Sequence, residues 1–390
     1  MTKLPSLLLL CLVVVAGMSP WFATAAALPD MVRETEISAM RQALMSSAVQ
    51  AGFVMGAVGM AISGLPDRFD PRRVLALSAL MNAAASLALL WVPLGGDMAI
   101  ALRFVAGAGF AGIYPVGMKI AVGWGQKDRG LLVGLLVGAL TFGSGAPHLA
   151  AYLGGAEWRV VIVAVSCASF LSAVGALFLT LGPHHARAPA FNPGAIKLMW
   201  TDRRIRAATG GYLGHMFELY VMWGWIGVAA AVGFGAHMEA GPAESLAALI
   251  AFLTIAAGAL TAAPAGWLAD RVGKAEVAAG AMVASGGAAI LVALTFGGPV
   301  WLSVVLILVW GAFVVADSAQ FSAMIADAAP PEAAGSLMAL QTALGFALTA
   351  VTVQLAPLVA GAIGWPWTLA LLALGPVAGV AALRPVFRRF

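Results

Sequence analysis

Charged residues are scarce in this chain. Only 10% of its 390 residues are Asp, Glu, Lys or Arg, whereas soluble domains carry about 25%. Hydrophobic residues make up 62% of the sequence, and the mean hydropathy is +0.96. A water-soluble fold cannot hide that much apolar surface. The scarcity of charge therefore excludes a soluble enzyme or a soluble binding module.

Cysteine and catalytic motifs are scarce as well. The two cysteines, Cys11 and Cys167, lie in apolar runs without a nearby Cys or His partner for a metal site. No Gly-x-Ser-x-Gly or His-Glu-x-x-His motif occurs. The best serine-hydrolase pair, Ser144 and His148, stands four residues apart inside an apolar run. We therefore expect no metal, no cofactor and no enzyme activity.

Twelve apolar runs divide the chain, six before and six after a polar segment at 184–206. They lie at 5–28, 43–64, 74–94, 98–122, 131–153, 160–181, 207–233, 245–267, 276–296, 300–325, 335–359 and 366–384. About 20 apolar residues are needed to cross a membrane as a helix, and the first run is too long for a signal peptide. The pattern predicts an all-α membrane protein of twelve spans, with six-helix bundles at 1–183 and 207–390 and a linker at 184–206.

The basic residues follow this topology. In the alternating loops, most of the 21 Lys and Arg residues fall on the side of the termini, and the other side receives only Arg33, Arg41 and Arg159. Lys and Arg collect on the cytoplasmic side of bacterial membranes. The pattern therefore predicts cytoplasmic termini and a multi-pass protein of the bacterial inner (plasma) membrane. The net charge of +4 has this topological origin and indicates no nucleic-acid partner.

A short loop of acidic and basic residues occurs twice, after the second and the eighth run. It reads GLPDRFDPRR at 64–73 and GWLADRVGK at 266–274. Both copies resemble the signature loop of the major facilitator superfamily, G-x-L-a-D-r-x-G-r-[KR]. The second copy matches nearly throughout, whereas the first departs from it at Pro66, Asp70 and Pro71.

This resemblance covers essentially the whole chain and implies the fold and the mechanism of the family. It implies two pseudo-symmetric six-helix bundles that rock about a site at the membrane midplane. It also implies a conformational latch made by Asp67, Arg68, Asp270 and Arg271, because a carboxylate at a helix end can pair with a loop Arg and release it again. Spans one, four, seven and ten would line the central cavity.

Four charged residues lie inside the predicted spans. Arg103 and Lys119 are in span four, Glu218 is in span seven, and Asp317 is in span ten. A charge at the bilayer centre costs about 3 kcal/mol or more, so the charges that occur there mark a pathway. All four fall on helices that the resemblance assigns to the cavity, although they were identified from charge alone.

The candidate proton-coupling residues are His215, Glu218 and Asp317. His215 and Glu218 are three residues apart and therefore share a helix face. They form either a pair that takes up and releases a proton or a structural hydrogen bond that fixes span seven. Asp317 is either a further proton site or the partner of a cation from the other half.

The candidate substrate-binding residues centre on Arg103, which is never deprotonated and must be paired or bind an anion. Lys119 lies about one turn from the cytoplasmic end of its span, where it either contacts substrate or extends to the interface. The other expected contacts are Tyr114, Tyr220, Trp223 and Gln320.

Together with the resemblance to the major facilitator superfamily, these residues predict a secondary active transporter. It would move a small polar organic solute, a carboxylate-bearing anion, by alternating access with proton coupling. The alternative is a proton-driven multidrug efflux antiporter, in which Arg103 and the segment GSGAP at 143–147 would supply the antiport machinery. The expected partners are the solute, protons and the lipid bilayer, and the expected oligomeric state is a monomer.

Overall fold

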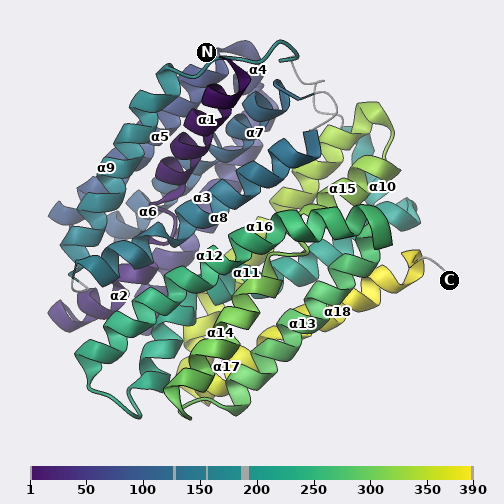
Figure 1. The fold of residues 1–390 in the computed structure, drawn as a ribbon. Coiled ribbons are helices and arrows are strands. Elements are labelled where there is room, and N and C mark those ends of the chain that lie inside the picture. Colours follow the sequence, from purple (N-terminus) through teal and green to yellow (C-terminus); the bar gives the residue numbers. More distant parts are fainter. Residues whose placement is uncertain (1, 126–128, 155–156, 186–192, 388–390) are drawn as a thin grey trace.

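The computed structural model describes residues 2–125, 129–154, 157–185 and 193–387. Within these ranges all regular elements are helices (Figure 1). The α-helices are α1 (Lys3–Met18), α2 (Ala23–Glu34), α3 (Ala39–Ser63), α4 (Leu65–Arg68), α5 (Pro71–Leu87), α6 (Asp97–Phe110), α7 (Tyr114–Val122), α8 (Arg129–Leu153), α9 (Trp158–Leu177), α10 (Ile196–Thr201), α11 (Arg203–Phe234), α12 (Ala240–Val272), α13 (Lys274–Leu294), α14 (Val300–Val314), α15 (Ser318–Ala328), α16 (Pro331–Ile363), α17 (Trp365–Leu372) and α18 (Leu374–Leu383). Three short 3₁₀ turns, η1 (Ala88–Trp91), η2 (Pro193–Ala195) and η3 (Arg384–Val386), complete the set.

Twelve stretches of the described chain are helical, long and apolar enough to cross a membrane. They are Lys3–Glu34, Ala39–Ser63, Pro71–Trp91, Asp97–Val122, Leu132–Leu153, Trp158–Leu177, Arg203–Phe234, Ala240–Val272, Lys274–Leu294, Val300–Ala328, Ala333–Ile363 and Trp365–Val386. The predicted all-α class and the twelve spans are confirmed. Several spans are longer than their apolar runs, because the helix continues into the polar residues at the membrane surface.

An even number of spans places both termini on one side of the bundle, which we call the terminal side. The side that holds the loop between Glu34 and Ala39 is the opposite side. Helices suit the membrane because their backbone hydrogen bonds are made within the segment. Polar side chains cap several helix starts: Ser38 accepts from the N–H of Arg41, and Asp202 accepts from two N–H groups at the start of α11.

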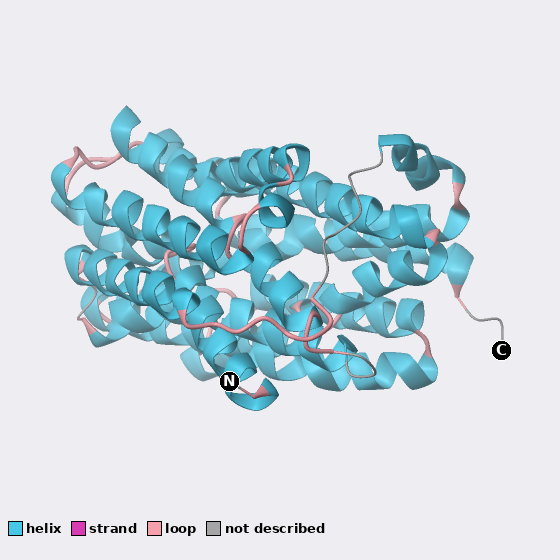
Figure 2. Ribbon diagram, turned by 90° about the horizontal axis from the view of Figure 1, so that it is seen from above, coloured by secondary structure: helices cyan, strands magenta, loops and turns pink. Residues whose placement is uncertain are grey.

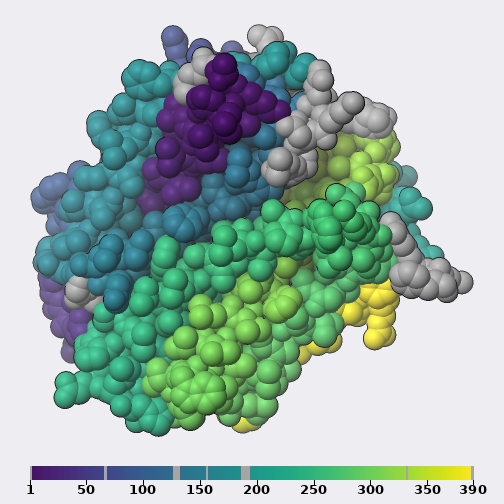
Figure 3. Space-filling view, viewed as in Figure 1, coloured from purple at the N-terminus to yellow at the C-terminus, as the bar shows by residue number. Residues whose placement is uncertain are grey.

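The spans form two groups in space. The first six (α1–α9, the first half) and the last six (α11–α18, the second half) occupy different regions of Figure 1. In the view from above, helices lie side by side with short loops at their ends (Figure 2). The halves meet where α3 packs on α16 and α8 packs on α12. On the face that Figure 3 shows, the purple-to-blue first half lies directly against the green second half. Residues 186–192 of the predicted linker lie outside the described residues, so the boundaries at 184 and 206 stay predictions.

Close helix packing recurs at equivalent places in the two halves. A Cβ on Gly107 in span four would lie 2.1 Å from the backbone oxygen of Val49 in span two. A Cβ on Gly311 in span ten would lie 2.3 Å from the backbone oxygen of Thr254 in span eight. Only glycine permits such approaches, as is common between membrane helices. The first glycine belongs to the RFVAG segment of the sequence, which therefore has a packing role.

Four of the described spans are interrupted near their middle, among them span twelve, which breaks between α17 and α18. Span one breaks between α1 and α2, span four between α6 and α7, and span ten between α14 and α15, whereas α11 of span seven is continuous. Each break is a tight turn with hydrogen bonds between residues three apart, such as Ile113 N–H to Phe110 O. Pro20 lies in the first break and Pro115 just after the second, where a missing N–H disfavours a regular helix. The breaks leave backbone groups that need other partners.

Candidate functional site

Three charged side chains and the histidine beside one of them, His215, are buried within the spans, and His148 of span five is buried as well. Arg103 is 0% exposed, Glu218 is 1% exposed, and His215 and Asp317 are each 2% exposed. They belong to span four, span seven and the break of span ten. Because burial of a charge in a membrane is costly, the partners of these groups define the site.

Arg103 reaches from α6 to the break in span one. Its Nη2 donates to the backbone carbonyl oxygens of Pro20, at 3.1 Å, and Trp21, at 2.7 Å. These carbonyls follow the C-terminal end of α1, where the helix dipole favours a cation. Nε and Nη1 of Arg103 are buried and have no hydrogen-bond partner among the described residues. Arg103 thus stabilises the break and still offers N–H groups to a further acceptor.

His215 lies against the break of span ten. Its Nδ1 is 2.8 Å from Oδ1 of Asp317, and its Nε2 is 3.1 Å from the hydroxyl of Ser318. The shared helix face had suggested Glu218 as the partner of His215. The structure corrects this pairing, because the break in span ten brings Asp317 to the imidazole. The two groups form a buried acid and base pair between spans seven and ten.

Glu218 has partners of its own within the second half. Oε1 accepts from the indole Nε1 of Trp310 at 2.8 Å, and Oε2 accepts from the hydroxyl of Ser285 at 2.9 Å. Trp310 belongs to α14 and Ser285 belongs to α13, whereas Glu218 belongs to α11. The carboxylate therefore joins spans seven, nine and ten. Within the described residues, no three His, Cys, Asp or Glu side chains gather where they could hold a metal ion.

Five aromatic rings meet between the halves, and we call them the central aromatic cluster. The ring centroid of Trp21 lies 5.4 Å from that of Phe53 and 4.6 Å from that of Phe110, both in the first half. It lies 5.8 Å from Tyr220 and 5.6 Å from Phe346, both in the second half. The indole Nε1 of Trp21 is buried without a partner among the described residues. Of these rings, only Tyr220 was predicted from the sequence as a substrate contact. The proline directly before Trp21 was the one local feature of the sequence that could have marked the position of Trp21.

The other predicted substrate contacts lie at different depths. Trp223 packs edge-on against Phe22 at 6.1 Å and extends the central aromatic cluster; its buried Nε1 has no partner in the described part of the chain. Gln320 is buried, and its Nε2 donates to the backbone oxygen of Ala316, in the break of span ten, at 3.4 Å. Tyr114 and Lys119 are partly buried in α7, between the break of span four and the terminal side.

The second copy of the repeated loop lacks the predicted ion pair. Arg271 stacks on the ring of Trp267, with the guanidinium carbon 3.5 Å from the ring centroid, and Nη1 donates to the backbone oxygen of Trp267 at 3.0 Å. Among the described residues, Asp270 forms no ion pair with Arg271. The indole competes for the guanidinium, because Arg binds aromatic faces well. A pair between Asp270 and Arg271 is thus absent from this conformation.

The first copy of the loop is built on a residue outside the predicted latch. The side chain of Asp67 lies outside the described residues, and Arg68 is exposed. Asp70, where the family pattern has glycine, caps α5 by accepting from the N–H of Arg72 at 2.9 Å and pairs with its guanidinium at 2.6 Å. The neighbouring Arg72 lowers the pKa of Asp70. Nη1 of Arg72 donates to the backbone oxygen of Leu179, which ties the loop to the end of span six.

Residues 9–254 of the chain match the family model described as Major Facilitator Superfamily. A mutant of the nucleoside transporter NupG has a similar structure, with a TM-score of 0.73 at 14% identity over 98% of this chain and 100% of that chain. The E. coli fucose:proton symporter FucP gives a TM-score of 0.65 at 13% identity, with both chains covered at 100%. A bacterial homolog of the human lysosomal transporter Spinster gives 0.75 at 14% identity over 97% of this chain and 95% of that chain. At these identities the likeness is one of fold. No curated protein sequence matches the chain significantly.

Proposed function

Because the chain belongs to the Major Facilitator Superfamily, we propose that it carries a small organic anion across the bacterial inner membrane by proton-coupled alternating access. The fold makes it a multi-pass membrane protein of a transporter family. Anion specificity, proton coupling, the orientation with cytoplasmic termini and the monomeric state are the proposed parts.

The observation that carries the anion proposal is that part of the Arg103 guanidinium has no hydrogen-bond acceptor among the described residues. Nη2 is used by the backbone of span one, whereas Nε and Nη1 are buried without a partner. A buried donor without an acceptor costs about 1–3 kcal/mol, and more when it is charged. A carboxylate supplies two acceptor oxygens to such a planar donor group. Arg103 therefore gains most from a carboxylate-bearing solute that reaches it when the halves separate.

The central aromatic cluster supports a solute with a flat or apolar body. Trp21 joins rings from both halves, and the indole N–H groups of Trp21 and Trp223 are buried without partners. Aromatic rings supply contact area, and indole N–H groups supply further donors. This donor-rich, ring-lined region fits an anion whose acceptor groups are attached to a compact organic frame.

The coupling part of the proposal rests on the His215 and Asp317 pair. Nδ1 of His215 and Oδ1 of Asp317 are 2.8 Å apart, close enough for a proton to pass between an imidazole and a carboxylate. The pair bridges spans seven and ten at a helix break, where a small movement changes its geometry. Uptake and release of one proton by this pair would accompany the rocking of the halves. The latch residues Asp67, Arg68, Asp270 and Arg271 remain proposed for the other end-state of that motion.

One observation favours a second candidate function, the proton-driven efflux of lipophilic drugs. The region between the halves is mostly aromatic, with Phe53 and Phe346 only 4.2 Å apart between ring centroids. Such rings also bind organic cations through their faces. The anion proposal ranks first because the buried fixed charge next to these rings is the cation of Arg103.

A thermal-shift screen of the purified protein tests the proposal. Carboxylates, amino acids, nucleosides and lipophilic cations are compared, since a ligand that binds the native state raises its melting temperature. We expect carboxylates to raise it in the wild type and not in Arg103→Ala. A shift with lipophilic cations alone, equal in both proteins, would replace the anion proposal with drug efflux.

A further inference from the structure

A pocket lies between the two halves, away from the groups described above. Helices α2 and α8 of the first half and α11 and α12 of the second half surround it. Its empty volume of about 360 Å³ includes an open mouth, so the enclosed part holds only a small guest. The pocket lies near the ends of α2 and α8 and the start of α12, hence on the opposite side of the bundle.

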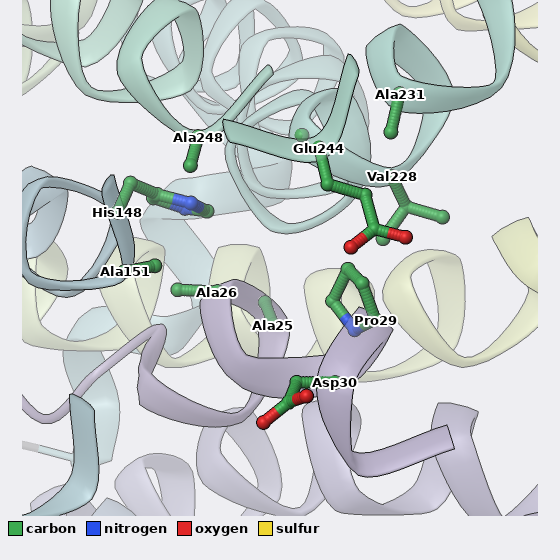
Figure 4. Close-up of a pocket in the computed structure, with 11 residues that line it drawn as sticks. Ala25, Ala26, Pro29, Asp30, His148, Ala151, Val228, Ala231, Glu244 and Ala248 are labelled. Atoms are coloured by element: carbon green, nitrogen blue, oxygen red, sulfur yellow. The ribbon is translucent and has the colours of Figure 1, made fainter. Parts of the chain in front are cut away.

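Small side chains form most of the pocket wall. Five alanines and one glycine line it: Ala25, Ala26, Ala151, Gly227, Ala231 and Ala248. Methyl groups make no hydrogen bonds, so the polar recognition of a guest falls to the ionisable residues of the pocket, which are Asp30, His148 and Glu244. Figure 4 shows the imidazole of His148 and the carboxylate of Glu244 on different sides of this apolar space.

His148 is the buried polar side chain of the pocket that lacks a partner. It is 2% exposed, and its Nε2 has no hydrogen-bond partner among the described residues. The ring makes a hydrogen bond with the backbone of Trp223, and its Nδ1 lies on the side of α11, close to Gly227. A neutral imidazole that donates through one nitrogen accepts through the other. Nε2 therefore offers an acceptor to a guest in the pocket.

The carboxylates of the pocket outnumber the neighbouring cation. Nη2 of Arg33 donates to Asp30 at 3.0 Å, and Nη1 donates to Oε2 of Glu244 at 2.5 Å. Two carboxylates and one guanidinium leave one negative charge at neutral pH. The second oxygen of Asp30 accepts from the backbone N–H of Trp158 at 2.7 Å, whereas Oε1 of Glu244 has no hydrogen-bond partner in the described part of the chain. The pocket thus suits a guest with one positive charge.

The arrangement of these acceptors favours an ammonium group over a metal ion. Asp30, His148 and Glu244 do not gather closely enough to hold a metal. A primary ammonium group carries three N–H donors around one charge, so it can donate to acceptors in separate directions. Its carbon end would contact the alanines of the wall, which a hydrated metal ion would leave unused. A buried acceptor without a donor gains from such a guest.

We propose that this pocket binds a small primary ammonium compound, whose N–H groups donate to Nε2 of His148 and Oε1 of Glu244. The two acceptors belong to different halves, so the guest binds best to the conformation in which the halves meet on this side. The site goes beyond the function proposed above, because it takes a cation and lies apart from Arg103.

The test is the melting temperature of the full-length protein in nanodiscs, titrated with methylammonium near neutral pH at constant ionic strength. Potassium and tetramethylammonium serve as comparisons, since both carry one positive charge and neither has an N–H donor. A ligand that binds the native state raises the melting temperature. We expect a saturable rise with methylammonium alone. Equal rises with all three cations, or no saturable rise with methylammonium, overturn the proposal.

Matched variants place the guest in the pocket. Glu244→Gln and His148→Leu each remove an acceptor and should weaken methylammonium binding by about tenfold, from the typical strength of a hydrogen bond to a charged group. Ala248→Val keeps every polar group but fills part of the space, and should weaken binding as well. Glu34→Gln is the control, because Glu34 lies on α2 but pairs with Arg159 within the first half.

The control and the variants give a clear decision. Unchanged affinity in Glu34→Gln, with weaker binding in the three pocket variants, supports the site. Unchanged affinity in Glu244→Gln and Ala248→Val would place the guest elsewhere and overturn it. The titration contains no organic anion, so a failed carboxylate screen leaves this result valid, and a failed ammonium site leaves the proposed role of Arg103 standing.

Discussion

The two halves hold their buried charges in opposite ways. The first half buries a cation, Arg103, and satisfies it with backbone carbonyls at the break of span one. The second half buries carboxylates, Glu218 and Asp317, and satisfies them with an indole, a hydroxyl and an imidazole. A guanidinium keeps its charge at all relevant pH values, whereas a carboxylate next to an imidazole can change its charge. This difference supports the proposed recognition of an anion by the first half and the proposed proton exchange in the second half.

Within the second half, substitutions of Asp317 and Glu218 test whether the proposed proton exchange belongs to the first carboxylate and a structural role to the second. We expect Asp317→Asn to abolish accumulation driven by a pH gradient, because the pair with His215 can no longer change its charge. Exchange of solute across the membrane should continue. Glu218→Gln should keep accumulation, because its partners are neutral donors, the indole of Trp310 and the hydroxyl of Ser285, and neither is an acid or a base near neutral pH. The measurement is uptake of the best compound of the thermal-shift screen into proteoliposomes, with and without a pH gradient.

The reverse outcome would exchange the two roles. If Glu218→Gln abolished gradient-driven uptake and Asp317→Asn kept it, Glu218 would be the proton site and the His215 contact a structural one. Equal loss in both variants, with exchange also lost, would mean that the second half needs both charges only to fold.

Substitutions of Arg103 test whether the buried cation of the first half also stabilises the fold. Arg103→Ala leaves the carbonyls of Pro20 and Trp21 without their donor, which should cost about 1–3 kcal/mol of stability. Arg103→Lys keeps a donor and the charge, and should recover most of that stability while it loses the planar donor pair that suits a carboxylate. The melting temperature without solute gives the first effect, and the solute-induced shift gives the second. Equal melting temperatures for all three proteins would show that the backbone contacts contribute no net stability.

The buried charges were predictable, but their partners were not. Apolar runs gave the twelve spans, and charge inside a run was enough to select Arg103, Glu218 and Asp317. The partner of His215 depended on a break in span ten that contains no proline, and the three-residue spacing to Glu218 was the stronger local signal. Trp21 and Phe346 come from spans one and eleven, and only the assembled halves bring them together. Contacts between distant spans leave no trace in spacing along one helix.

Substitutions in the repeated loops also test the difference between the halves, and they have the smallest expected effect on stability. Asp70 caps α5 and pairs with Arg72, whereas in the second copy Gly273 precedes α13 without a side-chain cap and Lys274 pairs with the exposed Asp327. Loss of a capping carboxylate costs about 1 kcal/mol, and an exposed pair contributes less than about 1 kcal/mol. We expect Asp70→Ala to lower the melting temperature at pH 7 more than Asp327→Asn does.

The effect of Asp70 should also depend on pH in a defined direction. Because Arg72 lowers the pKa of Asp70 in the folded protein, the carboxylate stabilises the fold above its unfolded pKa, and this contribution is lost as the pH falls through the folded pKa. The difference in melting temperature between wild type and Asp70→Ala should therefore shrink in acid. A difference that stays constant from pH 7 to pH 3 would mean that Asp70 acts through its shape and not through its charge. The first loop would then resemble its copy in the second half, where no carboxylate caps the helix.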